Sequence, residues 1–429
     1  MTRRARIPTA GLILVALLAG ACATRVVSPI GSAGRPFTLE ADERTLWARA
    51  EQEQAALLER VAIYDDPLLD EYLARIGDRL APEAVKAAGG PAFRIGVVRD
   101  PTLNAFALPN GRIYLHTGLL SRLENEAQLA AILGHEMAHV VNRDALRFTR
   151  QPRSAQTAQT GSPILGISAA TGVAAAGSRA EAGDVVGATV LGPTASAVLG
   201  LGLPLAAVAS INGYGRDRER EADAGGLAML VRAGYDPGEA ARVFALLRDE
   251  ARERGPVETF FLGSHPRLSE RLEAARQLLA TTYAAAATGT VRDTAEFGLR
   301  MHAVVRENAY EDIRVGRFRL ARAQLDRVLA RAPDDSVAHL YYGDWHRLQS
   351  QRALDAGERA DHLRHAVERY ERAAALDLAF AEPYRQLGLL HYQQKDAVRA
   401  REAFERYLAL QPDASDARRI REYLVELHR

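Results

Sequence analysis

The chain of 429 residues contains a single cysteine, Cys22. One cysteine excludes an internal disulfide and any zinc or iron–sulfur site built from several cysteines. Long hydrophobic runs are also missing, because no uninterrupted apolar stretch reaches the roughly 20 residues that cross a bilayer as a helix. The 55 basic residues balance 54 acidic ones, so bulk charge gives no reason to expect nucleic-acid binding. With 48% hydrophobic and 25% charged residues, the sequence predicts an ordered globular protein of two or three domains.

The N-terminus has the pattern of a secretory signal peptide. Basic residues precede a short apolar stretch, and small residues lead to Cys22. We interpret 1–21 as a signal peptide and Cys22 as the lipid anchor of a bacterial lipoprotein, since the single cysteine stands where the lipid would be attached. Residues 22–37 would be the tether, on the periplasmic side of the cell envelope. Ala23 follows the cysteine, which by resemblance to lipoprotein sorting favours the outer membrane; a soluble periplasmic protein is the alternative.

Two regions with different patterns follow the tether. Residues 38–290 combine helical periodicity with a predicted strand at 93–98 and a hairpin around Pro109-Asn110-Gly111. Residues 300–429 are helical throughout. Within the first region, 150–213 is rich in small residues, and its prolines favour a loop with short helices over a membrane-inserting hairpin. The expected fold class is mostly α with a small β-sheet (α+β).

The C-terminal region contains an internal repeat. Ala321, Ala366 and Ala400 each begin a segment with large apolar or small residues four and eight positions later. The second and third of these segments start 34 residues apart, and an insertion of 11 residues lengthens the interval before them. A 34-residue period of paired helices resembles tetratricopeptide repeats, which implies an α-solenoid. Gly343 and Gly388 occupy equivalent places, where a missing side chain would let paired helices approach closely.

The strongest chemical signal is Gly134-His135-Glu136-Met137-Ala138-His139, in a helix that a capping box at 121–124 is expected to begin. His135 and His139 are one turn apart, so both imidazoles project from one face and can bind one Zn²⁺. Glu136 can reach a metal-bound water and act as the general base, then as the acid for the leaving amine. Without such a role, these polar side chains would be costly to bury in an otherwise apolar run.

A catalytic zinc ion needs a third protein ligand and an open fourth position. The best source downstream is Glu219-Arg220-Glu221-Ala222-Asp223. Glu219 and Asp223 share a helix face, so one can bind the metal while the other orients a ligand histidine. Spacing alone does not say which of Glu219, Glu221 and Asp223 is the ligand, and alone this run would be interpreted as a solvated helix start.

Taken in order, these motifs resemble the HtpX/BepA-like zinc metallopeptidases. Gly-His-Glu-x-x-His-Val is followed by Glu-x-x-Ala-Asp, while 104–109 and 113–120 match the family's strand pair and Ser264-His265-Pro266 its His-Pro segment. The resemblance covers roughly 40–283. It implies a minigluzincin-type metallopeptidase domain in the first region, with one Zn²⁺ per chain, followed by the tetratricopeptide α-solenoid.

The resemblance also implies residue roles. Glu219 matches the third zinc ligand and Asp223 the supporting aspartate. His265 would either stabilise the oxyanion of the transition state or occupy the open zinc position as an inhibitory ligand; a helix-capping role beside Pro266 is the third alternative. One departure is Arg143-Asp144, where relatives carry Arg-His. We expect this change to alter local contacts only.

An extended peptide would pair with an edge strand near 113–116, which makes Ile113, Tyr114 and Leu115 the expected substrate-binding residues. The expected function is a zinc endopeptidase of the bacterial envelope. Its repeats would bind protein substrates or envelope assembly machinery, and the resemblance implies quality control of misfolded or unassembled outer-membrane proteins. An envelope chaperone or assembly scaffold with a latent peptidase site is the alternative. Prenyl-protein processing of the CAAX type would need several membrane spans and is set aside.

Overall fold

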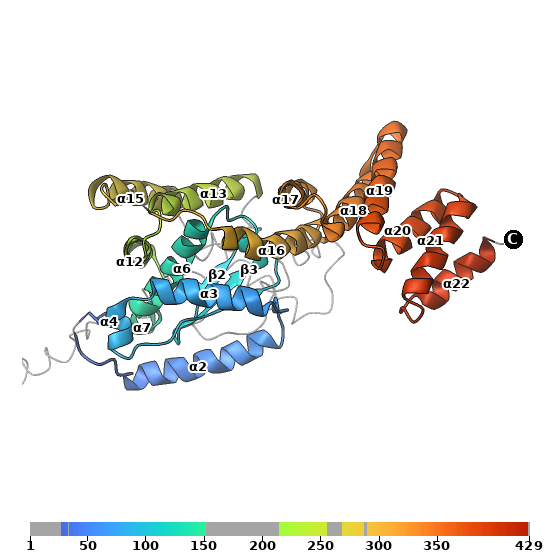
Figure 1. The fold of residues 1–429 in the computed structure, drawn as a ribbon. Coiled ribbons are helices and arrows are strands. Elements are labelled where there is room, and N and C mark those ends of the chain that lie inside the picture. The colour runs from blue at the N-terminus through green and yellow to red at the C-terminus, as the bar shows by residue number, and fades with distance from the viewer. Residues whose placement is uncertain (1–26, 33, 152–213, 255–267, 287–289, 428–429) are drawn as a thin grey trace, which may run out of the picture.

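The computed structural model describes five stretches of the chain, 27–32, 34–151, 214–254, 268–286 and 290–427. The predictions for the signal peptide, Cys22, His265 and nearly all of 150–213 therefore lie outside the described residues. The part described is mostly helical with one small sheet, which confirms the predicted α+β class (Figure 1).

The elements up to Thr281 are α2 (Ala41–Leu58), α3 (Pro67–Leu80), α4 (Glu83–Ala87), β1 (Arg94–Val98), β2 (Ala105–Ala107), β3 (Arg112–His116), α5 (Thr117–Leu120), α6 (Glu126–Val141), α7 (Asp144–Thr149), α12 (Arg216–Arg232), α13 (Gly238–Arg254) and α15 (Leu268–Thr281). The remaining elements are α16 (Ala295–Arg314), α17 (Phe318–Arg331), α18 (Ser336–Arg352), α19 (Ala356–Leu376), α20 (Ala381–Gln393), α21 (Ala397–Leu410) and α22 (Ala417–Glu426). No helix within the described stretches combines the length and the apolar character that crossing a membrane requires.

The three strands form a mixed sheet in the order β1-β3-β2. β2 and β3 are an antiparallel hairpin, as predicted, and Gly111 adopts the positive φ of 88° that its turn requires. β1 pairs with the other side of β3 in parallel, with Ile95 opposite Ile113. Consequently β3 is the central strand, and the prediction that a peptide pairs with Ile113, Tyr114 and Leu115 at an edge is wrong. Both sides of their backbone already have strand partners.

Helix α6 lies at the centre of the N-terminal part. Its N-cap is Asn125, whose side chain accepts a hydrogen bond from the backbone N–H of Gln128 at 3.0 Å. The capping box predicted at Ser121 is therefore wrong, because 117–120 forms the separate short helix α5. All residues of α6 from Glu126 to Val140 are buried. The helix that carries the histidine motif is thus enclosed by protein on all sides, including β2, α3, α12 and α13.

Helix α16 joins the C-terminal helices to this core. Its apolar face, including Phe297, Met301 and Val305, lies in the same hydrophobic cluster as Leu133 and Met137 of α6. In Figure 1 this helix runs from the N-terminal part towards the C-terminal helices. The beginning of the C-terminal region therefore packs as part of the body that contains the histidine motif.

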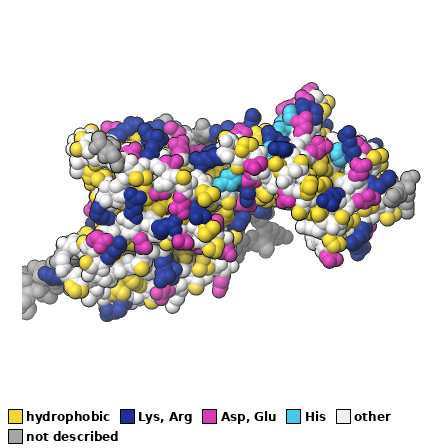
Figure 2. Space-filling view, in the orientation of Figure 1, with side chains coloured by type: hydrophobic (Ala, Val, Ile, Leu, Met, Phe, Trp, Pro, Cys, Tyr) yellow, Lys and Arg dark blue, Asp and Glu magenta, His cyan; other side chains and the backbone are white. Residues whose placement is uncertain are grey.

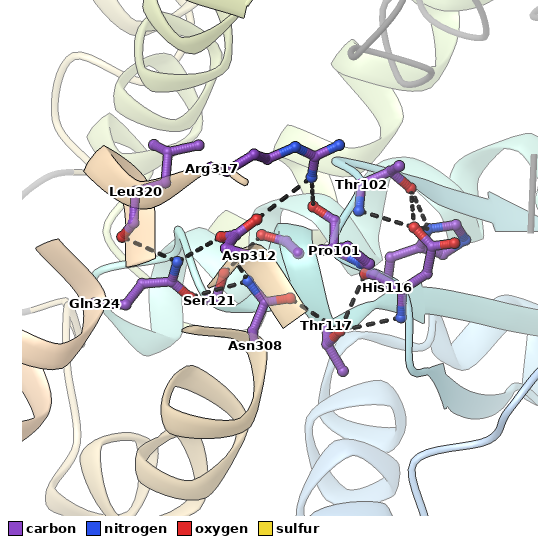
Figure 3. Close-up of polar contacts among 12 residues, drawn as sticks. Pro101, Thr102, His116, Thr117, Ser121, Asn308, Asp312, Arg317, Leu320 and Gln324 are labelled. Carbon is purple, nitrogen blue, oxygen red and sulfur yellow. Dashed lines mark hydrogen bonds and ion pairs between the residues drawn. The ribbon is translucent and has the colours of Figure 1, made fainter. Parts of the chain in front are cut away.

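A buried polar network reinforces this contact (Figure 3). The Asp312 carboxylate accepts hydrogen bonds from Arg122 at 3.1 Å and from Gln324 of α17 at 2.6 Å. The Asn308 side-chain oxygen accepts from the Thr117 hydroxyl of α5 at 3.1 Å. Because buried polar groups are stable only when they are paired, this network fixes how α16 sits on the segment that leads into α6.

From α16 onwards consecutive helices pack on one another, most extensively α16 with α17, α18 with α19 and α20 with α21. A Cβ on Gly343 would lie 2.4 Å from the Tyr370 ring, and one on Gly388 would lie 2.4 Å from the Phe404 ring. The close approach expected at both glycines is confirmed. The assignment of these pairs to tetratricopeptide repeats stays a prediction.

Candidate metal centre

Two glycines bring α6 and α12 into close contact. A Cβ on Gly226 would lie 2.8 Å from the His135 backbone nitrogen, and one on Gly134 would lie 3.0 Å from the Gly226 carbonyl oxygen. Only a residue without a side chain fits at this crossing. The two helices therefore pass near enough for the acidic face of α12, with Glu219 and Asp223, to meet the histidine face of α6.

The two histidines and Glu219 form a compact group of possible metal ligands. Nε2 of His135 lies 3.1 Å from Nε2 of His139, and the Glu219 carboxylate oxygens lie 3.6 Å and 3.5 Å from these two nitrogens. One ligand atom from each residue lies within 4.8 Å of the others, and all three residues are buried. Two imidazoles and one carboxylate at such spacing are the donor set of a three-ligand divalent metal site.

A carboxylate stands behind each histidine. The Asp223 Oδ1 atom lies 3.0 Å from Nδ1 of His135, and the Asp144 Oδ2 atom lies 2.8 Å from Nδ1 of His139. A carboxylate only accepts hydrogen bonds, so Nδ1–H of His139 donates to Asp144 and its Nε2 stays directed at the shared metal position. The Asp223 carboxylate lies at a similar distance from Nδ1 of His135. This arrangement fits a metal ion and agrees with the orienting role expected for Asp223.

The role of Asp144 was missed at the sequence level. It is fully buried and lies five residues after His139, at the place where the motif departs from the family pattern. Arg143 makes the contact possible, because its left-handed conformation, φ 58° and ψ 41°, turns the chain back under α6. That conformation costs an L-residue on the order of 1–3 kcal/mol. The Arg143 guanidinium, with Nε donating to Glu43 of α2 at 2.8 Å, holds the turn in place.

Arg271 of α15 is a further buried neighbour of the site. Its Nε donates to Asp223 Oδ2 at 2.9 Å and its Nη2 to Oδ1 at 2.6 Å. Nη2 also lies 3.2 Å from Nδ1 of His135. Burial lowers the pKa of this guanidinium, but the charge and hydrogen bonds of Asp223 outweigh burial and raise it. The arginine is therefore a permanent cation that fixes the Asp223 carboxylate beside His135.

The electrostatics around His139 favour a positive charge. Burial alone would lower the pKa of His139, but the Glu219 charge and the hydrogen bond to Asp144 raise it to about 9. A surrounding that stabilises a buried imidazolium also stabilises a divalent cation, which replaces the proton when the histidine becomes a ligand.

Glu136, His116 and Tyr214 are further buried residues in or near this part of the fold. Glu136 is buried beside His135 on α6, 1% exposed. His116 is buried and its Nδ1 lies 2.8 Å from the Thr102 hydroxyl oxygen. Tyr214, which the sequence did not single out, packs its ring 5.0 Å from the His139 ring. It closes the side of the site next to α7.

Comparisons with known proteins agree with this geometry. Residues 67–279 match the family model described as Peptidase family M48. Over 225 residues the chain is 32% identical to the putative beta-barrel assembly-enhancing protease of Vibrio cholerae, which covers 50% of this chain and 41% of that protein. It is 28% identical over 215 residues to the beta-barrel assembly-enhancing protease of Escherichia coli, covering 50% and 39% of the two chains.

A eukaryotic relative matches a similar share of the chain. The mitochondrial metalloendopeptidase OMA1 of Schizosaccharomyces pombe is 28% identical over 228 residues, which is 51% of this chain and 57% of that protein. The chain thus spans roughly two fifths to three fifths of the length of these relatives. The matched segment contains α6 and α12 with all three candidate ligands. By this match and by its site, the segment 67–279 is similar to the metallopeptidases of Peptidase family M48.

Proposed function

We propose that the protein is a zinc-dependent endopeptidase of the bacterial cell envelope, with one Zn²⁺ per chain held by His135, His139 and Glu219. The observation that carries this proposal is the buried three-ligand group whose two imidazoles are each held by a carboxylate. When bound there, a zinc ion supplies a Lewis acid that polarises a peptide carbonyl and lowers the pKa of water.

Glu136 carries the proton transfers. Its carboxylate takes a proton from the attacking water and returns it to the amine that leaves when the peptide bond breaks. Its neighbour on α6, His135, is kept in the tautomer that leaves Nε2 for the metal by Asp223, which Arg271 fixes in turn. Asp144 does the same for His139. His265 remains a candidate for stabilising the oxyanion or for inhibiting the site.

The substrate backbone is assigned to β2 instead of β3. β2 is an outer strand of the sheet and packs along α6, whereas β3 is enclosed between its two neighbours. Among the described residues, only β3 pairs with β2. A peptide that adds a strand beside Ala105–Ala107 would lie next to the histidine helix with its backbone held by hydrogen bonds.

The C-terminal helices supply a separate surface for protein partners. A groove of about 520 Å³ lies along α16, α18 and α20. Its lining residues include the stacked Tyr310 and Tyr341, and also Arg314 and Phe380. We assign it to unfolded segments of substrates or to assembly partners. The names of the bacterial relatives support outer-membrane β-barrel proteins as the substrate class, and the sequence pattern at Cys22 supports a lipid anchor in the envelope.

Glu136→Gln tests the proposed chemistry. The substitution keeps the size of the side chain and removes its basicity, so cleavage of an unfolded outer-membrane protein should fall by about 10²–10⁴-fold while the zinc content stays near one per chain. His135→Ala should lower zinc content and cleavage together. If the Glu136→Gln variant turns over substrate as fast as the wild type and restores the envelope phenotype of a deletion strain, the proposed chemistry is wrong. The protein then acts as a chaperone or scaffold with a latent site.

A further inference from the structure

Three histidines meet on the α18–α19 hairpin, far along the chain from the metallopeptidase motif. Nδ1 of His346 on α18 lies 3.1 Å from Nδ1 of His362 on α19. One turn further along α19, the His365 ring stacks on the His346 ring with centroids 5.0 Å apart and 22° between the planes. Figure 2 shows histidine side chains at the surface of this hairpin. The peptidase reaction uses none of them.

The separation of the two facing nitrogens equals that of the candidate ligands in the peptidase site. His346 and His362 present Nδ1 atoms 3.1 Å apart, and His135 and His139 present Nε2 atoms at the same distance. Two nitrogens bound tetrahedrally to Zn²⁺ at about 2.0–2.1 Å lie roughly 3.3 Å apart. The two facing nitrogens, which share a hydrogen bond here, are therefore spaced much like two ligands of one cation.

On His362 and His365, one ring nitrogen of each faces an oxygen atom of α19. Nδ1 of His365 lies 2.8 Å from the Asp361 carbonyl oxygen, which only accepts, so Nδ1 carries the proton and Nε2 is the acceptor nitrogen. Nη2 of Arg364 lies 3.4 Å from this Nε2 and would have to move away when a metal ion binds. Nε2 of His362 lies 4.0 Å from the Glu358 carboxylate. Such contacts fix the ring orientation and leave the opposite nitrogen for a metal.

Two aromatic rings hold the His346 side chain in place. The Trp345 ring packs edge-on against His346 with centroids 4.9 Å apart, and the Tyr342 ring stacks on its other side at 5.5 Å. Only His365 needs to turn its partly exposed side chain to complete a three-nitrogen set.

We propose that His346, His362 and His365 form a second site for a divalent transition metal of the zinc class, which clips α18 to α19. The ligands come from both helices of the hairpin, so the metal ion would stabilise the packing of these two helices instead of taking part in catalysis. The ligand type selects the metal class, because imidazole nitrogens favour Zn²⁺, Ni²⁺ and Cu²⁺ over Mg²⁺ and Ca²⁺.

The test counts zinc ions in four forms of the full chain after dialysis against buffered Zn²⁺. We expect two ions in the wild type, one in His346→Ala/His362→Ala, one in His135→Ala/His139→Ala, and none when the four changes are combined. His302→Gln, which removes an imidazole from α16 of the same helical region, is the matched control and should keep two. Equal zinc content in the wild type and in His346→Ala/His362→Ala would overturn the second site, whatever happens at the first.

A measurement on the unmodified chain covers the case in which the double variant fails to fold. Diethylpyrocarbonate transfers an ethoxycarbonyl group to free imidazole nitrogens and releases CO₂ and ethanol, and peptide mass spectrometry reports each modified site. Zn²⁺ should protect His346 and His362 at least severalfold, while Mg²⁺ should not. Modification of both residues at the same rate with and without Zn²⁺ would equally overturn the proposal.

Discussion

At the residue scale, two carboxylates from distant parts of the sequence stand behind the two ligand histidines. Asp223 comes from α12 and is held by Arg271, whereas Asp144 follows α6 directly and is reached through the left-handed turn at Arg143. The candidate site therefore includes carboxylates that are not ligands themselves, and we expect them to fix which nitrogen of each ring faces a metal ion.

Asp144→Asn should weaken metal binding while the fold is kept. The amide has nearly the same shape but no charge, so His139 loses the partner that holds its Nδ1–H and makes Nε2 more basic. We expect the zinc affinity to fall about 10–100-fold, as measured by competition with a chromophoric chelator. Asp217→Asn makes the same change on α12 where the side chain is 91% exposed, and it should have no effect. Equal affinities for both variants would exclude an orienting role for Asp144.

The sequence predicted that His135, His139 and Glu219 come together, and the structure confirms this grouping. One helical turn separates His135 from His139, and one separates Glu219 from Asp223, so the backbone geometry alone places each pair on one face. Asp144 was not predicted as a functional residue, since its contact depends on the positive φ of Arg143, which no residue preference for arginine indicates.

At the element scale, local patterns were more informative than long-range ones. Pro109-Asn110-Gly111 predicted the hairpin of β2 and β3, which the structure confirms. Local sequence patterns could not predict the order of the strands in the sheet. β1 pairs in parallel with β3 across a connection that contains β2, so the choice of neighbour is made by tertiary packing. That pairing is the reason why the predicted substrate strand was wrong.

Gly343 and Gly388 should tolerate no side chain. A methyl group at either position would meet an aromatic ring at 2.4 Å, with Tyr370 and Phe404 as the respective partners. We expect each change to Ala to lower the unfolding free energy of the helical region by about 1–3 kcal/mol in urea titrations, in spite of the higher helix propensity of Ala. The two losses of stability have the same cause, because α18 packs closely on α19 at Gly343 and α20 packs closely on α21 at Gly388.

Gly298→Ala is the control for this pair of variants. Gly298 is also a helical glycine, but the nearest atom to an added Cβ is the flexible end of Arg331 at 3.0 Å. This arginine can move, so the variant should be neutral or more stable by up to about 1 kcal/mol. Destabilisation of the same size at all three glycines would show that backbone flexibility, and not close helix packing, explains the effect.

The α18–α19 hairpin should lose stability in mild acid. Burial, together with the charges of His365, His362, Arg369 and Arg322, lowers the pKa of His346 to about 3, whereas an unfolded histidine titrates near 6.5. Between these two values the unfolded chain binds more protons, so the unfolding free energy falls as the pH falls below about 6.5. Urea titrations with a metal chelator at pH 7.5 and 5.5 measure this slope.

His346→Gln provides the comparison for the acid effect, because it removes the titrating group and keeps a polar side chain of similar length. The wild type should lose more stability between the two pH values than the variant does. If the wild type and His346→Gln lose the same unfolding free energy between pH 7.5 and 5.5, His346 has the same pKa in the folded and unfolded chains.

At the scale of the whole molecule, α16 ties the C-terminal helices to the metallopeptidase body. The matched family segment ends at residue 279, yet the apolar face of α16 shares its core with α6, and the hydrophobic cluster reaches Trp345 on α18. The helices from α20 onwards pack in separate clusters. The unit that contains the metal site is therefore expected to extend beyond the region of sequence similarity.

Two truncations of the full chain separate these parts. A stop after Leu376 removes α20 to α22 and leaves the central cluster whole, so the zinc content and melting temperature of the metallopeptidase part should stay close to those of the full chain. A stop after residue 290 removes α16 and exposes the surfaces that Phe297, Met301, Val304 and Val305 cover. Burial of such side chains is worth roughly 1.5–3 kcal/mol each, which together is on the order of 10 kcal/mol and comparable to the whole stability of a domain. We therefore expect the shorter chain to unfold or aggregate and to lose zinc. A folded, zinc-bound chain ending at 290 would show instead that α16 is an attached helix and not part of the catalytic unit.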